Sequence, residues 1–353
     1  MTRKRRSARN FRERTIAGQC YHSRLSKFLR AGFVACMNVF HDWQAPGLRT
    51  PSVLTMGVFD GLHLGHQTII RRVAERAAAL ECVPTVVTFD PHPRAVLYPG
   101  AAPPLLQTLG QRLEALRILG IQQALVLRFD RDLAALTAAE FAQRILFTTL
   151  GAREIYLGEN FVFGRGRQGN IATLRCLGMD YGCAAYEVEA VLLRGKRVSS
   201  TRLRDAIQSG RVNLARRMLM RPYGVEGKVV AGRRLGRTLD FPTANVAVIN
   251  RVLPADGVYV TATLIQGVWR RGVTNIGVRP TVGGDRQRVV ETHILDFAGD
   301  LYGASLRTRF LHRLRPERKF AGLDELRAQI ARDAARARRY FQRSGVRRSL
   351  AIE

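Results

Sequence analysis

Residues 53–66 read Val-Leu-Thr-Met-Gly-Val-Phe-Asp-Gly-Leu-His-Leu-Gly-His, an apolar run that ends at a glycine. The run 53–56 predicts a buried strand. A helix should follow at once, because Ile69, Ile70, Val73, Ala77 and Leu80 recur at helical spacing. Further short apolar runs predict strands at 85–89, 124–129 and 154–157, with helical patterns between them. Strand–helix–strand repetition implies parallel pairing through right-handed crossovers, so the first half predicts a doubly wound α/β domain.

The pattern changes after residue 222. Apolar runs follow one another with Gly, Pro and Asp turns and no helical pattern between them, at 225–230, 258–265, 268–277, 289–297 and 306–314. This spacing predicts an antiparallel all-β unit, most simply a small barrel. A final helix is predicted from a stripe of apolar residues: Leu323, Leu326, Ile330, Ala334, Ala337 and Phe341.

With 353 residues, the chain exceeds the roughly 250–300 at which one core stops growing, so two domains are expected. The predicted division is an extension at 1–36, an α/β domain at 37–207, a connecting segment at 208–222 and a β domain at 223–345. The extension is basic, with ten basic residues and one acid, and has no clear periodicity. Three readings stay open for it: a disordered arm, which we favour, a targeting peptide, or translated sequence upstream of a start at Met37.

Charge is the unusual feature of the composition. The chain holds 57 Lys and Arg against 28 Asp and Glu, a formal net charge of +29, and only five of the basic residues are lysines. Such a balance suits anionic partners: nucleic acid, an acidic membrane surface or phosphorylated substrates. Outside the extension the arginines are spread along the chain and aromatic residues are only 8%, which favours a basic enzyme with polyphosphate substrates.

Cysteines and hydropathy limit the cellular setting. The five cysteines show no C-x-x-C pair, which argues against a disulfide framework or zinc site and fits a reducing cytoplasm. No apolar run approaches the ~20 residues of a membrane span, so no membrane association is expected.

The stretch after the first predicted strand has the chemistry of a polyphosphate site. Gly57, Gly61 and Gly65 allow the backbone to approach a ligand closely. His63 and His66 lie three apart at a helix start, so both rings are expected beside the amide groups that favour anions. Together they would stabilise charge that develops on a phosphorus under attack. The later run Ser199-Ser200-Thr201 before Arg202 predicts a helix N-cap.

A second phosphate-binding pattern opens the β half. Gly232 and Gly236 lie in a glycine- and arginine-rich stretch whose backbone amides are suited to cradling phosphates. Thr243 and Asn245, at i and i+2 in an extended segment, should project to the same side. A hydroxyl and an amide oxygen so placed suit Mg²⁺, which takes few protein ligands beside substrate phosphates.

These runs resemble a known family. Residues 57–66 are similar to the G-x-F-D-G-x-H-x-G-H signature of the nucleotidylyltransferase superfamily, and residues 198–204 to its second signature. Residues 87–94 and 158–167 resemble segments of prokaryotic bifunctional riboflavin kinase/FMN adenylyltransferases (FAD synthetases). The β half resembles the riboflavin kinase module of the same enzymes at residues 227–245, 275–281, 290–296, 300–303 and 314–320. The resemblance covers roughly Ser52 to Phe341. Asp240 departs from it, since the family usually has glycine there.

The resemblance implies a role for each matching residue. Catalysis is assigned to His63 and His66 in the adenylyltransferase and to Glu291, the base of the kinase. ATP binding in the adenylyltransferase falls to Gly57, Phe59, Asp60, Gly65, Asn160, Arg165, Arg167, Ser199, Ser200, Thr201, Arg202 and Arg204. Flavin binding falls to Phe89, Asp90, Pro91, His92, Arg279 and Arg315. ATP binding in the kinase falls to Gly232, Gly236, Thr243 and Asn245, with Thr243 and Asn245 holding Mg²⁺.

Residues 164–169 also match the dinucleotide fingerprint G-x-G-x-x-G. They follow only a short apolar run late in the α/β domain, so we interpret them as an arginine-bearing loop over the ATP site.

The implied fold is an N-terminal doubly wound nucleotidylyltransferase domain followed by a small antiparallel barrel with a C-terminal helix. The implied function is phosphorylation of riboflavin to FMN and adenylylation of FMN to FAD, with ATP, riboflavin and FMN as substrates and no specific nucleic-acid or membrane partner. Two alternatives stay open: a kinase with an inactive nucleotidylyltransferase-like domain, and a basic nucleic-acid-binding protein. The oligomeric state is not predicted.

Overall fold

The computed structural model describes residues 36–48, 50–231, 241–280 and 286–342. The predicted extension at 1–36 lies outside this range apart from Cys36, and so do Gly232, Gly236 and Asp240. The chain divides into two units, residues 1–36 and 37–353, and everything below concerns the second.

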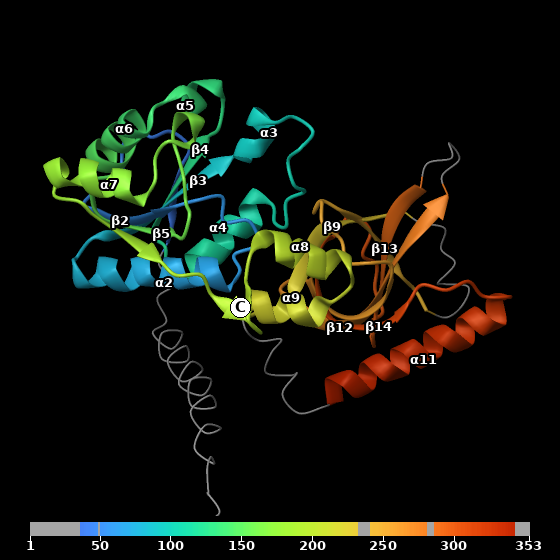
Figure 1. Ribbon diagram of the computed structural model, residues 1–353. Coiled ribbons are helices and arrows are strands. Elements are labelled where there is room, and N and C mark those ends of the chain that lie inside the picture. The colour runs from blue at the N-terminus through green and yellow to red at the C-terminus, as the bar shows by residue number, and fades with distance from the viewer. Residues whose placement is uncertain (1–35, 49, 232–240, 281–285, 343–353) are drawn as a thin grey trace, which may run out of the picture. The chain divides into compact units, whose positions relative to one another are not determined.

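A parallel sheet occupies the first part of this unit (Figure 1). Its strands are β1 (Asn38–Phe40), β2 (Ser52–Met56), β3 (Val83–Asp90), β4 (Gln123–Arg128), β5 (Ala152–Gly158) and β6 (Ala184–Val188). They are ordered β1-β4-β3-β2-β5-β6, and every pairing is parallel. The four strands predicted from apolar runs are confirmed as β2 to β5. The sequence did not predict β1 or β6. β1 has only three residues, and most residues of β6 are exposed, so neither strand forms an apolar run.

Helices cover both faces of the sheet. The helices before the barrel are α2 (Leu64–Ala79), α3 (Pro93–Leu97), α4 (Leu109–Ile118), α5 (Arg131–Ala135), α6 (Ala138–Phe141) with the π-helix Ala142–Thr149, α7 (Ile171–Gly178), α8 (Ser200–Gln208) and α9 (Val212–Leu219). The buried apolar residues of α8 and α9 share a core with the barrel rather than with the sheet. Neighbouring residues of β2 pack on opposite faces of the sheet. Val53 belongs to the core that the sheet forms with α2 and α4, and Leu54 belongs to the core that it forms with α6 and α7. Figure 1 shows α2 below the strands and α6 and α7 above them. The predicted doubly wound domain is confirmed, although Leu80 caps α2 and is exposed rather than buried.

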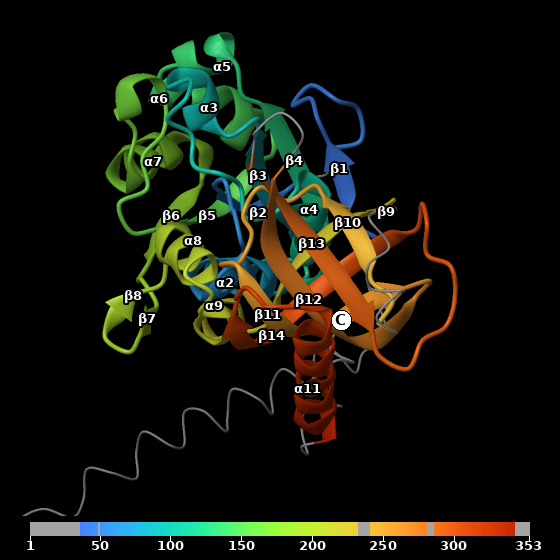
Figure 2. The same ribbon diagram turned by 90° about the vertical axis from the view of Figure 1, so that its right-hand side faces the viewer.

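A closed antiparallel barrel forms the second part (Figure 2). Its strands are β9 (Tyr223–Val230), β10 (Ala244–Val248), β11 (Gly257–Ile265), β12 (Val268–Pro280), β13 (Arg286–Ile294) and β14 (Ser305–Pro316), ordered β10-β13-β12-β11-β14-β9. All its pairings are antiparallel, as predicted. A two-stranded ribbon, β7 (Leu192–Leu193) with β8 (Lys196–Arg197), lies between the two parts in sequence.

The last helix, α11 (Leu323–Gln342), packs against the barrel with only part of its predicted stripe. Ala334, Ala337 and Phe341 share a core with β11 and β14 residues such as Val260 and Leu311, while Leu323 is exposed. The stripe therefore predicted the helix correctly but overstated its buried face at the N-terminal end.

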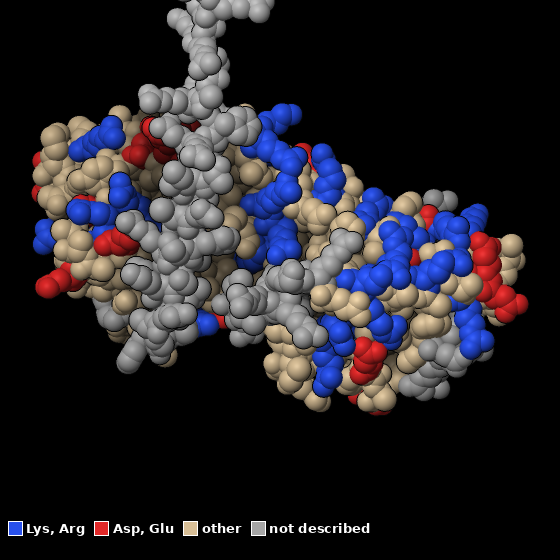
Figure 3. Space-filling model, turned by 90° about the horizontal axis from the view of Figure 1, so that it is seen from below, with Lys and Arg blue, Asp and Glu red and all other residues tan. Residues whose placement is uncertain are grey.

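Basic side chains are prominent on one face of the molecule (Figure 3). Lys and Arg side chains cover much of the face drawn in Figure 3, with smaller groups of Asp and Glu between them. Within the described residues, no helix is both long enough and apolar enough to cross a membrane.

Candidate functional site: two phosphate-handling centres

The first candidate centre lies where the direction of sheet winding reverses. From β2 the chain moves through β3 to β4 on one side, while β5 and then β6 pair on the other. In open parallel sheets, ligands bind outside the carboxyl ends of the strands at such a switch point. The run Gly57–His66 leaves the carboxyl end of β2 there and enters α2 directly.

The turn between β2 and α2 has a backbone that only certain residues tolerate. Phe59 has φ +52° and Gly61 has φ +89°. A Cβ added to Gly61 would approach side-chain carbons of Leu106 and Leu203 to 2.8 and 2.9 Å. Gly61 is therefore required both by its backbone conformation and by close packing. Arg221, at the start of the barrel segment, donates to the Gly61 carbonyl at 3.1 Å and holds the turn from outside.

The two histidines stack on each other at the start of α2. Their ring centroids are 3.8 Å apart with planes inclined by 19°, and the Phe59 ring meets His66 edge-on at 5.2 Å. His63 is the N-cap of α2, since its Nδ1 accepts from the His66 amide at 3.4 Å. The Nδ1 atom of His66 is buried without a hydrogen-bond partner among the described residues. That nitrogen is available to a ligand in a place where an unsatisfied polar atom is costly.

Burial keeps both imidazoles neutral at neutral pH when no ligand is bound. It lowers the pKa of His63 to about 4, with the Arg197 charge acting in the same direction. Burial and the neighbouring His63 also lower the pKa of His66 well below its usual value. The neutral histidines therefore offer hydrogen-bonding groups rather than positive charges. A polyphosphate placed beside them would raise both pKa values.

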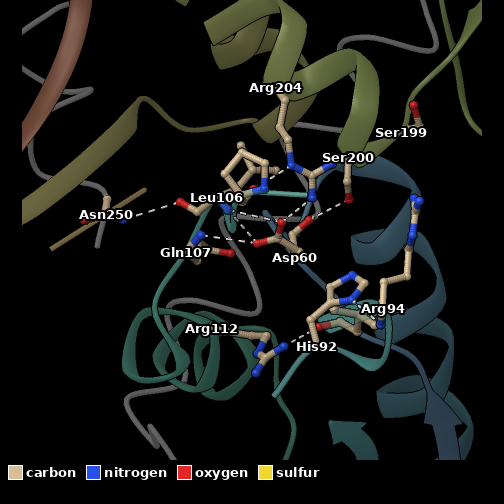
Figure 4. Close-up of polar contacts among 12 residues, drawn as sticks. Asp60, His92, Arg94, Leu106, Gln107, Arg112, Ser199, Ser200, Arg204 and Asn250 are labelled. Atoms are coloured by element: carbon tan, nitrogen blue, oxygen red, sulfur yellow. Dashed lines mark hydrogen bonds and ion pairs between the residues drawn. The ribbon is translucent and has the colours of Figure 1, made fainter. Parts of the chain in front are cut away.

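Asp60 forms a buried ion pair with Arg204 (Figure 4). The Arg204 guanidinium donates to Asp60 Oδ2 at 2.6 Å, and both side chains are at most one-tenth exposed. Arg204 also donates to the Pro104 carbonyl at 2.8 Å, and Asp60 accepts from the backbone amides of Leu106 and Gln107. Two residues that the resemblance assigns to ATP binding are thus bonded chiefly to protein groups.

The second signature begins α8, as the capping pattern predicted. The Ser199 hydroxyl accepts from the Arg202 amide at 3.2 Å, and the Ser200 hydroxyl donates to the Asp60 carbonyl at 2.7 Å. The guanidinium of Arg202 donates to three carbonyls of the β7–β8 ribbon, those of Leu193, Lys196 and Arg197. Thr201 is exposed at the start of the helix. A helix N-terminus with a free hydroxyl beside it favours an anion, so this end of α8 is a candidate phosphate-binding position.

The predicted flavin segment lies at the carboxyl end of β3. Phe89 is buried against Phe129, Asp90 ends the strand, and His92 caps α3 by accepting from the Arg94 amide at 3.0 Å. Pro91 follows Asp90 in a cis peptide. Burial lowers the pKa of His92. This segment therefore approaches the same switch point from the neighbouring strand.

Arg112 is a residue that sequence reasoning missed. It is 4% exposed on α4 and donates to the Val58 carbonyl at 2.7 Å and the Phe89 carbonyl at 3.2 Å. It therefore ties the predicted phosphate turn to the predicted flavin segment. A signal was present in the sequence, because position 112 falls on the buried face between Leu109 and Leu116.

The loop after β5 contains Asn160, Arg165 and Arg167, all exposed. Phe163 and Gly169 exchange backbone hydrogen bonds of 3.0 Å across it, and a Cβ on Gly169 would come within 2.6 Å of the Ala138 Cβ. The glycines of the G-x-G-x-x-G match therefore close a tight loop. The loop follows the carboxyl end of β5 and carries Arg165 and Arg167. β5 is the neighbour of β2, the strand that leads into His63 and His66.

The second candidate centre is a polar row on the barrel. Glu291 of β13 lies directly opposite Asn245 of β10 and, on its other side, opposite Asn275 of β12. Side chains directly opposite each other on neighbouring strands share one face, with Cβ atoms about 4.5–5.5 Å apart. Glu291 alternates with the buried residues Val290 and Thr292, so this row faces away from the barrel core.

Thr243 precedes β10 by one residue and follows an anchored segment. The His293 ring contacts the Pro242 carbonyl through Nδ1 at 2.9 Å and the Phe241 ring at 5.5 Å. These contacts hold the approach to β10 against β13, so Thr243, Asn245 and Glu291 lie within one small region. The remaining predicted members, Gly232, Gly236 and the side chain of Arg279, lie outside the described residues.

Arg315 is held by α11. Its Nε donates to Asp333 at 2.8 Å, and Asp333 is 2% exposed. The guanidinium also lies over the Phe320 ring at 5.6 Å. Arg315 thus links the last barrel strand to the C-terminal helix, and its carbonyl lies beside Gly257.

The fold and the two centres define a class: a nucleotidylyltransferase-type parallel domain joined to a β-barrel kinase-type domain. The family model for FAD synthetase matches residues 46–202, and that for riboflavin kinase matches residues 219–341. The chain is 42% identical to a bifunctional riboflavin kinase/FMN adenylyltransferase of Pseudomonas fluorescens over 81% of its own length and 92% of the relative's. The corresponding protein of Escherichia coli K12 is 40% identical over 82% and 92%.

A solved structure from Streptococcus pneumoniae, described as a macrolide-efflux protein, superposes with a TM-score of 0.77. It is 30% identical, and the match covers 86% of this chain and 98% of that one. The chain belongs to the family of bifunctional riboflavin kinase/FMN adenylyltransferases.

Proposed function

We propose that the barrel transfers a phosphoryl group from ATP to riboflavin and that the parallel domain transfers an adenylyl group from ATP to the resulting FMN. The observation that carries the proposal is that the described residues of the two matched regions contain two separate polar centres. One is the stacked pair His63–His66 at the switch point, and the other is the cross-strand pair Asn245–Glu291 on the barrel.

In the barrel, Glu291 accepts the proton of the riboflavin 5′-hydroxyl. The hydroxyl oxygen bonds to the γ-phosphorus of ATP, the bond from that phosphorus to the β–γ bridging oxygen breaks, and ADP leaves. Glu291 suits this role because it stands on a hydrogen-bonded central strand of the barrel, flanked by Asn245 and Asn275. Its position is fixed by strand register rather than by a flexible loop.

The donor atoms near Glu291 fit Mg²⁺. A threonine hydroxyl, an asparagine amide oxygen and a neighbouring carboxylate are hard oxygen ligands of the kind that this ion takes beside phosphates. Thr243 and Asn245 would hold the ion, which when bound offsets negative charge on the ATP phosphates. The described residues contain no cluster of three or more His, Cys, Asp or Glu that would bind a metal without substrate.

In the parallel domain, a phosphate oxygen of FMN bonds to the α-phosphorus of ATP, the bond to the α–β bridging oxygen breaks, and pyrophosphate leaves. His63, His66 and the N-terminus of α8 at Thr201 bind the phosphates and stabilise the charge that develops. Asn160, Arg165 and Arg167 approach from the loop after β5. Phe89, Asp90, Pro91 and His92 line the flavin side.

The hydrogen bonds of Asp60, Ser199, Arg202 and Arg204 support a positioning role for these four residues. Because these side chains are bonded to protein groups, we assign Asp60 and Arg204 to holding the two signatures together, Ser199 to capping α8 and Arg202 to fixing the β7–β8 ribbon. ATP contact is then assigned to the histidines, Thr201 and the loop arginines. We further propose a cytoplasmic location, in keeping with small-molecule substrates and free cysteines among the described residues.

The deciding experiment is to incubate the purified protein with riboflavin, ATP and Mg²⁺ and to separate the products over time. FMN should appear first and FAD second. FMN that accumulates without FAD would leave the parallel domain without its proposed activity. Formation of neither product would contradict the kinase assignment, and FMN supplied directly with ATP would then test the adenylyltransferase assignment.

A further inference from the structure

A short segment of the parallel domain, Leu106 with Gln107, is hydrogen-bonded both to Asp60 of its own domain and to side chains of the barrel. The backbone amides of Leu106 and Gln107 donate to the Asp60 carboxylate at 2.9 and 3.2 Å. On its other side, the Leu106 carbonyl accepts from two barrel side chains, the Tyr223 hydroxyl at 3.1 Å and the Asn250 amide at 3.4 Å. We call Leu106 and Gln107, together with their three side-chain partners Asp60, Tyr223 and Asn250, the Leu106 bridge.

One end of the bridge lies inside the adenylyltransferase signatures (Figure 4). Asp60 pairs with Arg204 and its carbonyl accepts from Ser200, so it joins the first signature to the second. The Leu106 side chain packs so closely on Gly61 that no Cβ fits there. A shift of Leu106 therefore displaces the turn that leads into His63.

The other end of the bridge is built from buried barrel groups. The single proton of the Tyr223 hydroxyl is shared between the Leu106 carbonyl at 3.1 Å and the Val252 carbonyl at 2.8 Å, and burial raises the pKa of this hydroxyl, so it remains a donor. Asn250, 7% exposed, bonds Gln111 at 2.8 Å and accepts from the Glu226 amide at 2.9 Å. Buried polar groups that lose a partner carry the full cost of desolvation, so these contacts favour one placement of Leu106.

We infer that Tyr223 and Asn250, although they belong to the kinase barrel, are positioning residues for adenylyl transfer. They hold Leu106, Leu106 holds Asp60 and Gly61, and these hold the phosphate-binding turn. The inference rests on the proposed assignment of FMN adenylylation to the parallel domain. It means that the barrel contributes to FAD formation through its structure as well as by supplying FMN.

The test compares two tyrosine variants. Tyr223→Phe removes only the bridging hydroxyl. Tyr259→Phe is the matched control, because that buried hydroxyl donates to the Ala255 carbonyl within the barrel segment and touches no residue of the parallel domain in the described contacts. kcat and KM are measured separately for FMN adenylylation and for riboflavin phosphorylation, beside thermal unfolding.

Tyr223→Phe should lower kcat for adenylylation about three- to tenfold, the range expected for losing one buried neutral hydrogen bond. KM for riboflavin and kcat for phosphorylation should stay within about twofold of wild type. Tyr259→Phe should leave adenylylation unchanged. Asn250→Ser shortens the side chain that supplies the second donor to the Leu106 carbonyl, and it should reproduce the selective fall in adenylylation. This variant tests the inference if Tyr223→Phe does not fold.

Equal losses of both activities, or a lower unfolding temperature with unchanged adenylylation kcat, would overturn the inference and leave the bridge purely structural. Failure of the proposed function has a different signature. In that case the wild-type protein itself makes no FAD from FMN and ATP.

Discussion

The two centres reach similar chemistry by different means. The centre on the parallel sheet is assembled from turns and helix ends, and buried polar bonds hold it: Asp60 to Arg204, Ser200 to Asp60, and Arg112 to two carbonyls. The centre on the barrel needs none of these. Asn245, Glu291 and Asn275 stand side by side because three strands are in register.

This difference predicts how each centre fails. A centre held by register tolerates side-chain changes around it and is lost only when a reacting group is lost. A centre held by buried polar bonds is sensitive to substitutions at a distance, because removing one partner leaves another unsatisfied.

The largest expected effect tests the barrel. Glu291→Gln keeps the shape but removes the base, and riboflavin phosphorylation should fall about a thousandfold, within the range for general-base catalysis. FAD formation from added FMN should remain. Glu226→Gln is the control, since Glu226 is a paired carboxylate on β9 whose charge meets Arg307. Product chromatography separates the outcomes. Loss of FAD formation from FMN in Glu291→Gln would show that the two centres are not independent.

The second largest effect is expected at the centre on the parallel sheet. His66→Ala removes a ring that lies in the phosphate turn, and FMN adenylylation should fall about a hundredfold, or roughly 3 kcal/mol in barrier. Thr68→Ala, on the same helix, removes a hydroxyl that donates to the Leu64 carbonyl of its own helix and should keep the activity. Initial rates at saturating ATP and FMN provide the measurement. A His66→Ala protein that adenylylates normally would exclude the ring from the reaction.

A pH effect distinguishes the buried histidine from an exposed one. The pKa of His63 is lowered to about 4, below its unfolded value of 6.5, so between these values only the unfolded chain takes up the proton. The free energy of unfolding should therefore fall as pH drops from about 6.5 to 4, by roughly 2–3 kcal/mol without nucleotide, and then level off. Protonation of Nδ1 also removes the acceptor that caps α2.

His63→Asn is the matched variant for this effect, because asparagine caps helices well and does not titrate. Its stability, measured by urea unfolding at several pH values, should lack the His63 part of the decline. Parallel curves for the two proteins would show that His63 titrates normally.

The smallest effect concerns the second signature. Ser199→Ala removes the N-cap of α8 and should cost about 1 kcal/mol of stability, while Ser199→Asn should retain it. If the KM for ATP in adenylylation rises strongly in both variants, Ser199 contacts substrate directly and is more than a cap.

The sequence predicted elements better than partners. Four parallel strands and five barrel strands followed from apolar runs, since burial and period are local properties of the chain. Glu291, Thr243 and Asn245 were assigned through the family resemblance and an extended spacing, and the ladder brings Glu291 opposite Asn245.

The remaining features depend on distant contacts. The resemblance assigned Arg202 and Arg204 to ATP binding, and the structure shows Arg202 bonded to carbonyls and Arg204 to Asp60, 144 residues away. Arg112, Tyr223 and Asn250 were not selected at all, because a buried polar residue shows its role only when its partner is known. The boundaries proposed for the domains and the role of residues 1–36 stay predictions.

The central claim is that two separate centres carry out consecutive steps. It is tested most directly by mixing the Glu291→Gln and His66→Ala proteins with riboflavin, ATP and Mg²⁺. Each variant alone should form little or no FAD, while the mixture should form FAD through released FMN. A mixture that forms no FAD, although each variant performs its own retained step, would contradict the account.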